Sequence, residues 1–199
     1  MAQAMSKIDQ LRDYHPRDRQ QWREWLQNNH DTSSGIWFIY YRKASGKVRV
    51  SYDDAVEEAL CFGWIDSLPR KLDDQRSKLL FTPRKPKSVW SRLNKQRVEK
   101  LIEQSLITEA GLKKIEAAQQ DGSWNKLDEA EALKIPLDLA EVLKTNKPAG
   151  KYFNLFSSST KKAILGWIAN AKRPETRSKR IEKTTAMAAE NKRVNFDPD

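Results

Sequence analysis

The chain has one cysteine, two histidines and no long apolar run, and each shortage excludes a class of protein. Cys61 has no second cysteine with which to form an internal disulfide, so the fold does not depend on an oxidising compartment. Zinc needs several suitably placed His, Cys or carboxylate ligands, and the chain supplies only two His and one Cys. We therefore predict no metal site, and we predict no cofactor. No apolar stretch approaches the ~18–20 residues that cross a bilayer, and the first residues lack the apolar core of a secretory signal. We therefore expect a cytoplasmic protein without membrane insertion.

Positive charge is abundant, with a formal net charge of +10. Residues 67–104 hold 11 Lys and Arg against 4 Asp and Glu, and residues 151–199 hold 11 against 5. Two such segments favour an anionic partner, either a small anionic ligand or a protein, through a focused positive potential. A solvated lysine-rich face explains the same counts, so both interpretations stay open.

Two capping patterns predict the first helices. Asp18 with Gln21 forms a capping box for a helix that ends near His30, and Ser51 with Asp54 caps a second helix. Residues 36–41 are rich in β-branched and aromatic residues and are predicted to form a central strand. Residues 64–72 and 76–82 have an extended, alternating pattern and are predicted to form a β-hairpin. Ser88 is expected to cap a third helix that carries Trp90 and Arg97, and Thr108 to begin a fourth.

Beyond residue 135 the pattern predicts only helices. Their expected ranges are about 136–144, 148–156, 158–172 and 174–191. The prolines Pro136, Pro148 and Pro174 each suit a first helical position, where a missing amide proton costs little. The predicted fold class is therefore α+β, with a small antiparallel sheet and flanking helices followed by a C-terminal helical module. We place a loose leader at 1–17, the α+β domain at 18–132, the helical module at 133–195 and a tail at 196–199.

The candidate ligand site spans the hairpin, the basic loop that follows it and the start of the third helix. Asp66 falls on the same side of its strand as Trp64, and an acid there needs a partner such as Arg84, Arg92 or Arg97. The basic loop before Ser88 leads into a predicted helix N-terminus, where free amide protons and positive side chains suit an anion. The candidate ligand-binding residues are Trp64, Asp66, Arg84, Lys87, Trp90, Ser91, Asn94 and Arg97. The same residues also suit a satisfied polar core, and the sequence does not decide between them.

Two other chemistries stay open. Arg173, Arg177 and Arg180 follow helical spacing and form an alternative contact for anions or nucleic acid, although a solvated face explains them equally. Asp66 in a dry pocket would act as an acid or base. We name no catalytic residue, because no nucleophile or acid–base constellation is present. Cys61 lies in an apolar helical context and is expected to be a buried, inert thiol.

Several motifs carry a family resemblance. They are Trp25-Leu26, Asn29-His30, Ser51-Tyr52, the run 57–66, Phe81-Thr82-Pro83-Arg84, Trp90-Ser91-x-x-Asn94, Trp167-Ile168 and the run 171–181. In this order they resemble the YdeI/OmpD-associated family over roughly residues 18–192. The resemblance implies a bacterial protein linked to protection against bacteriocins or antimicrobial peptides and to stress resistance, and it carries over no catalytic residue. The sequence thus favours a non-enzymatic binding or stress-protection protein, with a sequence-independent nucleic-acid binder and an enzyme using Asp66 as the alternatives.

Overall fold

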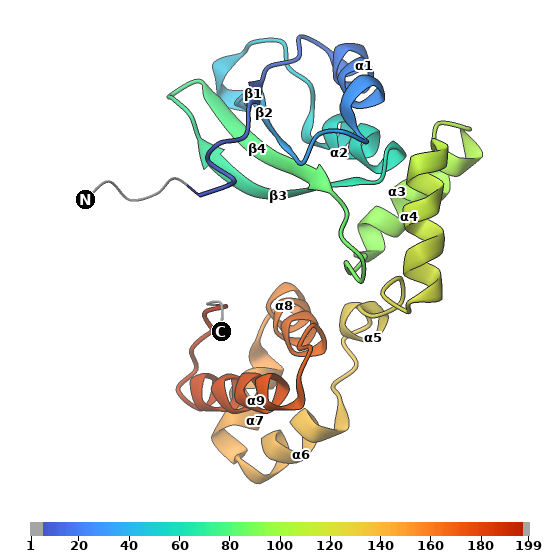
Figure 1. The fold of residues 1–199 in the computed structure, drawn as a ribbon. Helices are drawn as coiled ribbons and strands as arrows, with labels where there is room; N and C mark the ends of the chain where they lie inside the picture. Colours follow the sequence, from blue (N-terminus) through green and yellow to red (C-terminus); the bar gives the residue numbers. More distant parts are fainter. Residues whose placement is uncertain (1–5, 197–199) are drawn as a thin grey trace. The chain divides into compact units, whose positions relative to one another are not determined.

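A computed structural model describes residues 6–196 as an α+β fold with two compact units (Figure 1). The first unit contains the described residues up to Ser88 together with Leu93–Gln120. The second contains Val89–Arg92 and the described residues from Asp121 onward. Across residues 6–196, no helix has both the length and the apolar character needed to span a membrane.

A four-stranded mixed sheet organises the first unit. Its strands are β1 (Asp13–Tyr14), β2 (Ile36–Tyr41), β3 (Trp64–Lys71) and β4 (Arg76–Pro83), in the spatial order β1-β2-β4-β3. The predicted hairpin and central strand are confirmed, and β2, β4 and β3 are antiparallel as expected. Strand β1 pairs with β2 in parallel and has only two residues. It lies within residues 1–17, for which the sequence predicts a loose leader.

Helices α1 (Arg19–Asn29) and α2 (Tyr52–Cys61) cover one face of this sheet (Figure 1). The indole of Trp22 is fully buried and lies 4.9 Å from the ring of Phe38 and 5.3 Å from that of Phe81, measured between ring centroids. Both predicted caps are confirmed, because Asp18 accepts from the amide of Gln21 and Ser51 from the amide of Asp54. A short 3-10 turn, η1 (Lys43–Ser45), separates β2 from α2.

The first unit ends with α3 (Arg92–Glu103) and α4 (Glu109–Gln120). Gly63 turns the chain after α2 with a φ of 72°, a left-handed value that favours glycine. Gly111 lets α4 approach the end of α2 so closely that a Cβ there would overlap the carbonyl of Cys61. Thr108 anchors the same contact by donating its hydroxyl to that carbonyl over 2.7 Å.

The helical module of the second unit is confirmed. Its helices are α5 (Asp128–Glu131), α6 (Leu137–Thr145), α7 (Lys147–Leu155), α8 (Ser158–Ala169) and α9 (Pro174–Ala189). Their apolar faces bury a common core that includes Leu139, Phe153, Ile164 and Ile168, each with 0% exposure. Pro174 occupies the first helical position as predicted, whereas Pro136 is the residue before α6.

The third predicted helix begins later than expected. Ser88 does not cap it, since α3 starts at Arg92. The amide of Ser88 instead donates to the carbonyl of Lys85 over 3.2 Å, and Lys87 has a left-handed φ of 60°. This turn keeps the backbone out of the helical conformation, and Trp90 therefore precedes the helix on which it was expected.

Candidate functional site

Trp64 stands at the start of β3, on the face that the helices cover. Its side chain is 1% exposed, and its indole nitrogen donates to the carbonyl of His30 over 3.0 Å. The ring meets Trp25 edge to face, with centroids 5.7 Å apart. Trp64 is thus a core residue whose polar atom is satisfied from α1, and it presents no open surface to a ligand.

Asp66, two residues further on the same strand, is half-buried and accepts a hydrogen bond from the hydroxyl of Tyr52 over 2.8 Å. Burial and this carboxylate raise the pKa of Tyr52 to about 12. Arg84 follows β4, with its amide bonded to the carbonyl of Gly63, and its side chain is buried. Burial lowers the pKa of Arg84 to about 10, although the negative charge of Asp66 acts in the opposite direction. Asp66 is thus close enough to Arg84 for its negative charge to favour the charged form of that guanidinium.

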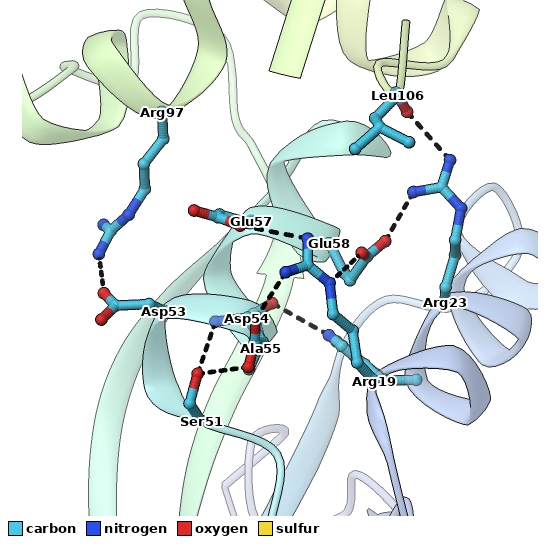
Figure 2. A network of polar contacts seen from close by, with 11 residues as sticks. Arg19, Arg23, Ser51, Asp53, Asp54, Ala55, Glu57, Glu58, Arg97 and Leu106 are labelled. Atoms are coloured by element: carbon cyan, nitrogen blue, oxygen red, sulfur yellow. Dashed lines mark hydrogen bonds and ion pairs between the residues drawn. The ribbon is translucent and has the colours of Figure 1, made fainter. Parts of the chain in front are cut away.

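Arg97 links α3 to the start of α2 (Figure 2). Its guanidinium pairs with the carboxylate of Asp53 and donates to the side-chain oxygen of Asn94 over 3.0 Å. The guanidinium carbon lies 5.9 Å from the centre of the Tyr52 ring. The Arg97 side chain is 9% exposed and that of Asp53 is 71% exposed, so a nearly buried cation has its counter-charge at the surface.

Hydrogen bonds, an ion pair and a ring contact join the predicted residues Asp66, Asn94 and Arg97 to Tyr52 and Asp53 in the first unit, and Arg84 is grouped with them because the charge of Asp66 acts on its pKa. We call this group the Tyr52 cluster: Tyr52, Asp53, Asp66, Arg84, Asn94 and Arg97. Tyr52 and Asp53 are the members that the sequence does not indicate. A tyrosine at the first position of a helix has no chemical signature, and a carboxylate there is fully explained by the helix dipole.

The Tyr52 cluster as defined does not include the predicted residues Lys87, Trp90 and Ser91. Lys87 is exposed in the turn before Ser88. Trp90 and Ser91 belong to the second unit, where the buried Trp90 ring lies 4.9 Å from that of Trp124. Trp90 precedes α3, so it does not share that helix with Asn94.

A second polar network joins α1 to α2 (Figure 2). The buried carboxylate of Glu58 accepts from Arg19 and from Arg23, each over 2.6 Å. Arg19 also pairs with Asp54 over 2.5 Å. Burial alone would lower the pKa of Arg19, but these two carboxylates raise it above its ordinary value. Each carboxylate here has a cation, and the network holds two helices together rather than leaving a reactive group.

Cys61 ends α2 with 0% exposure, which confirms that it is buried. Burial, with a smaller contribution from Glu58, raises the pKa of its thiol to about 11. A thiol with that pKa is protonated at neutral pH and is a poor nucleophile.

The three arginines of the alternative anion site have different surroundings. Arg173 is the exposed residue before α9. Arg177 binds the carboxylate of Asp138 through two nitrogens, over 2.6 and 3.0 Å. Arg180 donates to the carbonyl of Trp167 over 2.6 Å and lies 4.8 Å from that indole. Two of the three therefore make contacts inside the second unit. Within residues 6–196 there is also no group of three or more His, Cys, Asp and Glu that would hold a metal ion.

Comparison with known families divides the chain at nearly the same place as the fold. A domain of unknown function, DUF8412, matches residues 14–114, just over half of the chain. The family described as Bacteriocin-protection, YdeI or OmpD-Associated matches residues 132–191, which contain α6–α9. The YdeI/OmpD resemblance is thus confirmed for the helical part, whereas most of the N-terminal motifs fall within the other family. No curated protein and no solved structure matches the chain.

Proposed function

Because the chain belongs to the DUF8412 family over residues 14–114 and carries a bacteriocin-protection, YdeI or OmpD-associated domain over residues 132–191, we propose that it is a non-enzymatic binding protein that protects a bacterium against bacteriocins or antimicrobial peptides. In this proposal, the helical domain carries the link to protection. The first unit supplies a binding site for a small anionic group, and that site is the Tyr52 cluster.

The proposed anion site rests on the difference in exposure between Arg97 and its partner Asp53. Arg97 is nearly buried, but the carboxylate that pairs with it is 71% exposed. An exposed carboxylate gains little from a single ion pair, since solvent screens the attraction, and it can rotate into water. The guanidinium has no such freedom and still requires a negative partner. A carboxylate or phosphate from solution can therefore take the place of Asp53, and planar guanidinium is well suited to bind either group.

The surroundings of Arg97 favour this exchange. Asn94 holds one guanidinium nitrogen, which fixes the orientation of the group while the other terminal nitrogen faces Asp53. Tyr52 is 48% exposed and places an aromatic ring beside the same guanidinium. The Tyr52 hydroxyl is held by Asp66, so the ring is anchored as one wall of the site.

The anion site predicts opposite effects for the two members of the ion pair. The substitution Asp53→Asn removes the competing carboxylate, so binding of inorganic phosphate should become about three- to tenfold tighter. Arg97→Gln removes the cation, and phosphate binding should be lost. Chemical-shift titration with phosphate, and with acetate as a carboxylate probe, measures both effects.

Asp74→Asn is the matched control, because it makes the same charge change on the β3–β4 turn at a side chain that is 95% exposed. It should leave phosphate binding unchanged. If Asp53→Asn and Asp74→Asn tighten phosphate binding equally, the effect is due to net charge and not to the position of Asp53. Unchanged phosphate binding by a folded Arg97→Gln variant would show that Arg97 does not form the site.

The protective role has its own test. Deleting the gene should lower survival in the presence of polymyxin B, and the wild-type gene should restore it. If the anion site serves protection, Arg97→Gln should fail to restore survival while Asp74→Asn succeeds. Equal survival with and without the gene, against this peptide and against a bacteriocin, would reject the protective role without affecting the phosphate measurement.

A further inference from the structure

The sheet of the first unit has a second face, opposite α1 and α2, with a distinct composition. Directly opposed residues in antiparallel strands share a face, and the register pairs Ile39 with Lys78, and Lys78 with Arg70. Trp37 lies on this same face by the two-residue alternation along β2. The indole of Trp37 has two cationic neighbours, the guanidinium of Arg70 at 4.7 Å and the ammonium of Lys78 at 4.8 Å from its ring centre. This face is therefore aromatic and basic.

The beginning of the described chain lies against this face. We call residues 6–14 the strap; β1 at its end lies beside β2 (Figure 1). Asp9 pairs with Arg70 over 2.5 Å and Asp13 with Lys78 over 2.9 Å. The carbonyl of Ile8 accepts from the indole nitrogen of Trp37 over 3.0 Å. Under the strap, Trp37 is only 1% exposed.

A short strand pairing and partly exposed ion pairs hold the strap. Its main-chain pairing with β2 involves two residues, and the Asp9–Arg70 pair is exposed to 33% and 41% at its two side chains. Ion pairs at such exposure contribute little to stability, because solvent screens the attraction. A pocket of about 340 Å³ is lined by the strap residues Leu11 and Arg12 together with Trp25 and Ser34. The strap is therefore held by two ion pairs, one indole hydrogen bond and a two-residue strand.

We propose that this sheet face is a docking site for a peptide segment of a partner protein that carries two carboxylates, and that the strap occupies the site in cis. The partner segment would carry two carboxylates at the spacing of Asp9 and Asp13, for Arg70 and Lys78. A carbonyl before the first carboxylate would accept from the indole of Trp37. The residues of the partner segment from its second carboxylate onward would pair with β2 in the place of β1.

Peptide chemistry suits the face better than nucleic acid does. Phosphates would satisfy the two cations, and a base would stack on an indole. Neither would reproduce the parallel main-chain pairing with β2, which requires amides and carbonyls. The strap shows that carboxylates, a carbonyl and a short strand together fill the site.

The test uses the full chain and a fluorescein-labelled peptide that repeats residues 6–14. In wild-type protein the closed strap reduces the apparent affinity by the fraction of molecules that are open. The double variant Asp9→Asn/Asp13→Asn loses both ion pairs of its own strap, so it should bind the labelled peptide about fivefold more tightly by fluorescence anisotropy. Adding Arg70→Gln/Lys78→Gln to that variant should remove the binding.

The control is Glu109→Gln/Glu116→Gln, which changes the net charge by the same amount on α4 and should bind the peptide like the wild type. A peptide carrying Asn in place of both Asp residues should bind weakly to every variant. Absence of binding to the Asp9→Asn/Asp13→Asn variant, or an equal gain in the control, would overturn the proposal. So would tighter binding of a nine-nucleotide oligothymidylate that depends on Arg70 and Lys78, since the face would then be assigned to nucleic acid.

Discussion

At the scale of single residues, Cys61 shows most directly how burial decides chemistry. Its thiol has 0% exposure, and burial raises its pKa from the ordinary 9.0 to about 11. We expect the native thiol to react with iodoacetamide at pH 8 far more slowly than free cysteine does, and to react at the free rate in urea. Labelling followed by mass spectrometry measures both rates. Fast labelling of the folded chain would show that the end of α2 opens.

The same pKa gives a pH dependence with a definite sign. A thiol whose pKa is raised by folding contributes stability below pH 9, and this contribution is lost as pH rises towards 11. The wild-type chain should therefore lose more stability between pH 8 and 11 than Cys61→Ala does, as measured by urea unfolding. Subtracting the variant's curve removes the contribution of the other groups that titrate in this range.

At the scale of helices and strands, the approach of α4 to α2 depends on one missing side chain. A Cβ at Gly111 would overlap the carbonyl of Cys61, so Gly111→Ala should force the helices apart and destabilise the first unit by about 1–3 kcal/mol. Urea unfolding followed by circular dichroism measures the change.

Gly166 in α8 is the matched control for this substitution. A Cβ there would meet the nearest atom, of Leu127, at an ordinary 3.6 Å, and alanine suits a helix better than glycine. Gly166→Ala should therefore be neutral or stabilise by about 0.5–1 kcal/mol. Equal destabilisation by both substitutions would mean that the contact with Cys61 is not the cause.

The sequence predicts the elements that depend on residues a few positions apart. It does not predict the elements whose position depends on residues far away along the chain. The caps at Asp18 and Ser51 depend on atoms three residues away, and both are where the sequence indicates. Strand β1 has two residues and no alternation of its own; its position follows from β2 and from ion pairs with Arg70 and Lys78, more than fifty residues along the chain.

The candidate site divides in the same way. The sequence indicates an acid on β3 that needs a basic partner, and in the structure the charge of Asp66 raises the pKa of Arg84 against the effect of burial. It does not indicate that Tyr52 would bind Asp66, or that Arg97 would choose Asp53. The first contact joins α2 to β3 and the second joins α3 to α2, and residue spacing carries no information about how these elements pack.

At the scale of the whole molecule, each unit has its own ion pairs and should have its own response to acid. In the second unit, hydrogen bonds from Arg177 lower the pKa of Asp138, which connects the start of α6 to α9. A carboxyl whose pKa is lowered by folding stabilises the fold above its ordinary value of 3.8, and this stability is lost as pH falls below it. Asp138→Asn should therefore destabilise the chain at pH 7 and reduce the loss of stability between pH 5 and 2.

Circular dichroism of acid unfolding compares the two curves. Asp74→Asn, at an exposed turn in the first unit, should leave the acid response of the second unit unchanged. Parallel acid curves for the wild type and Asp138→Asn would exclude Asp138 as a contributor.

Strand β1 has a consequence for any shortened form of the chain. It occupies the outer edge of β2, whose sequence Ile-Trp-Phe-Ile-Tyr-Tyr is wholly β-branched or aromatic, without charge or proline. A chain that begins after Tyr14 would present this strand as an open sheet edge, and such edges template pairing with other molecules. The two residues of β1 thus keep an aggregation-prone sheet edge paired within the chain.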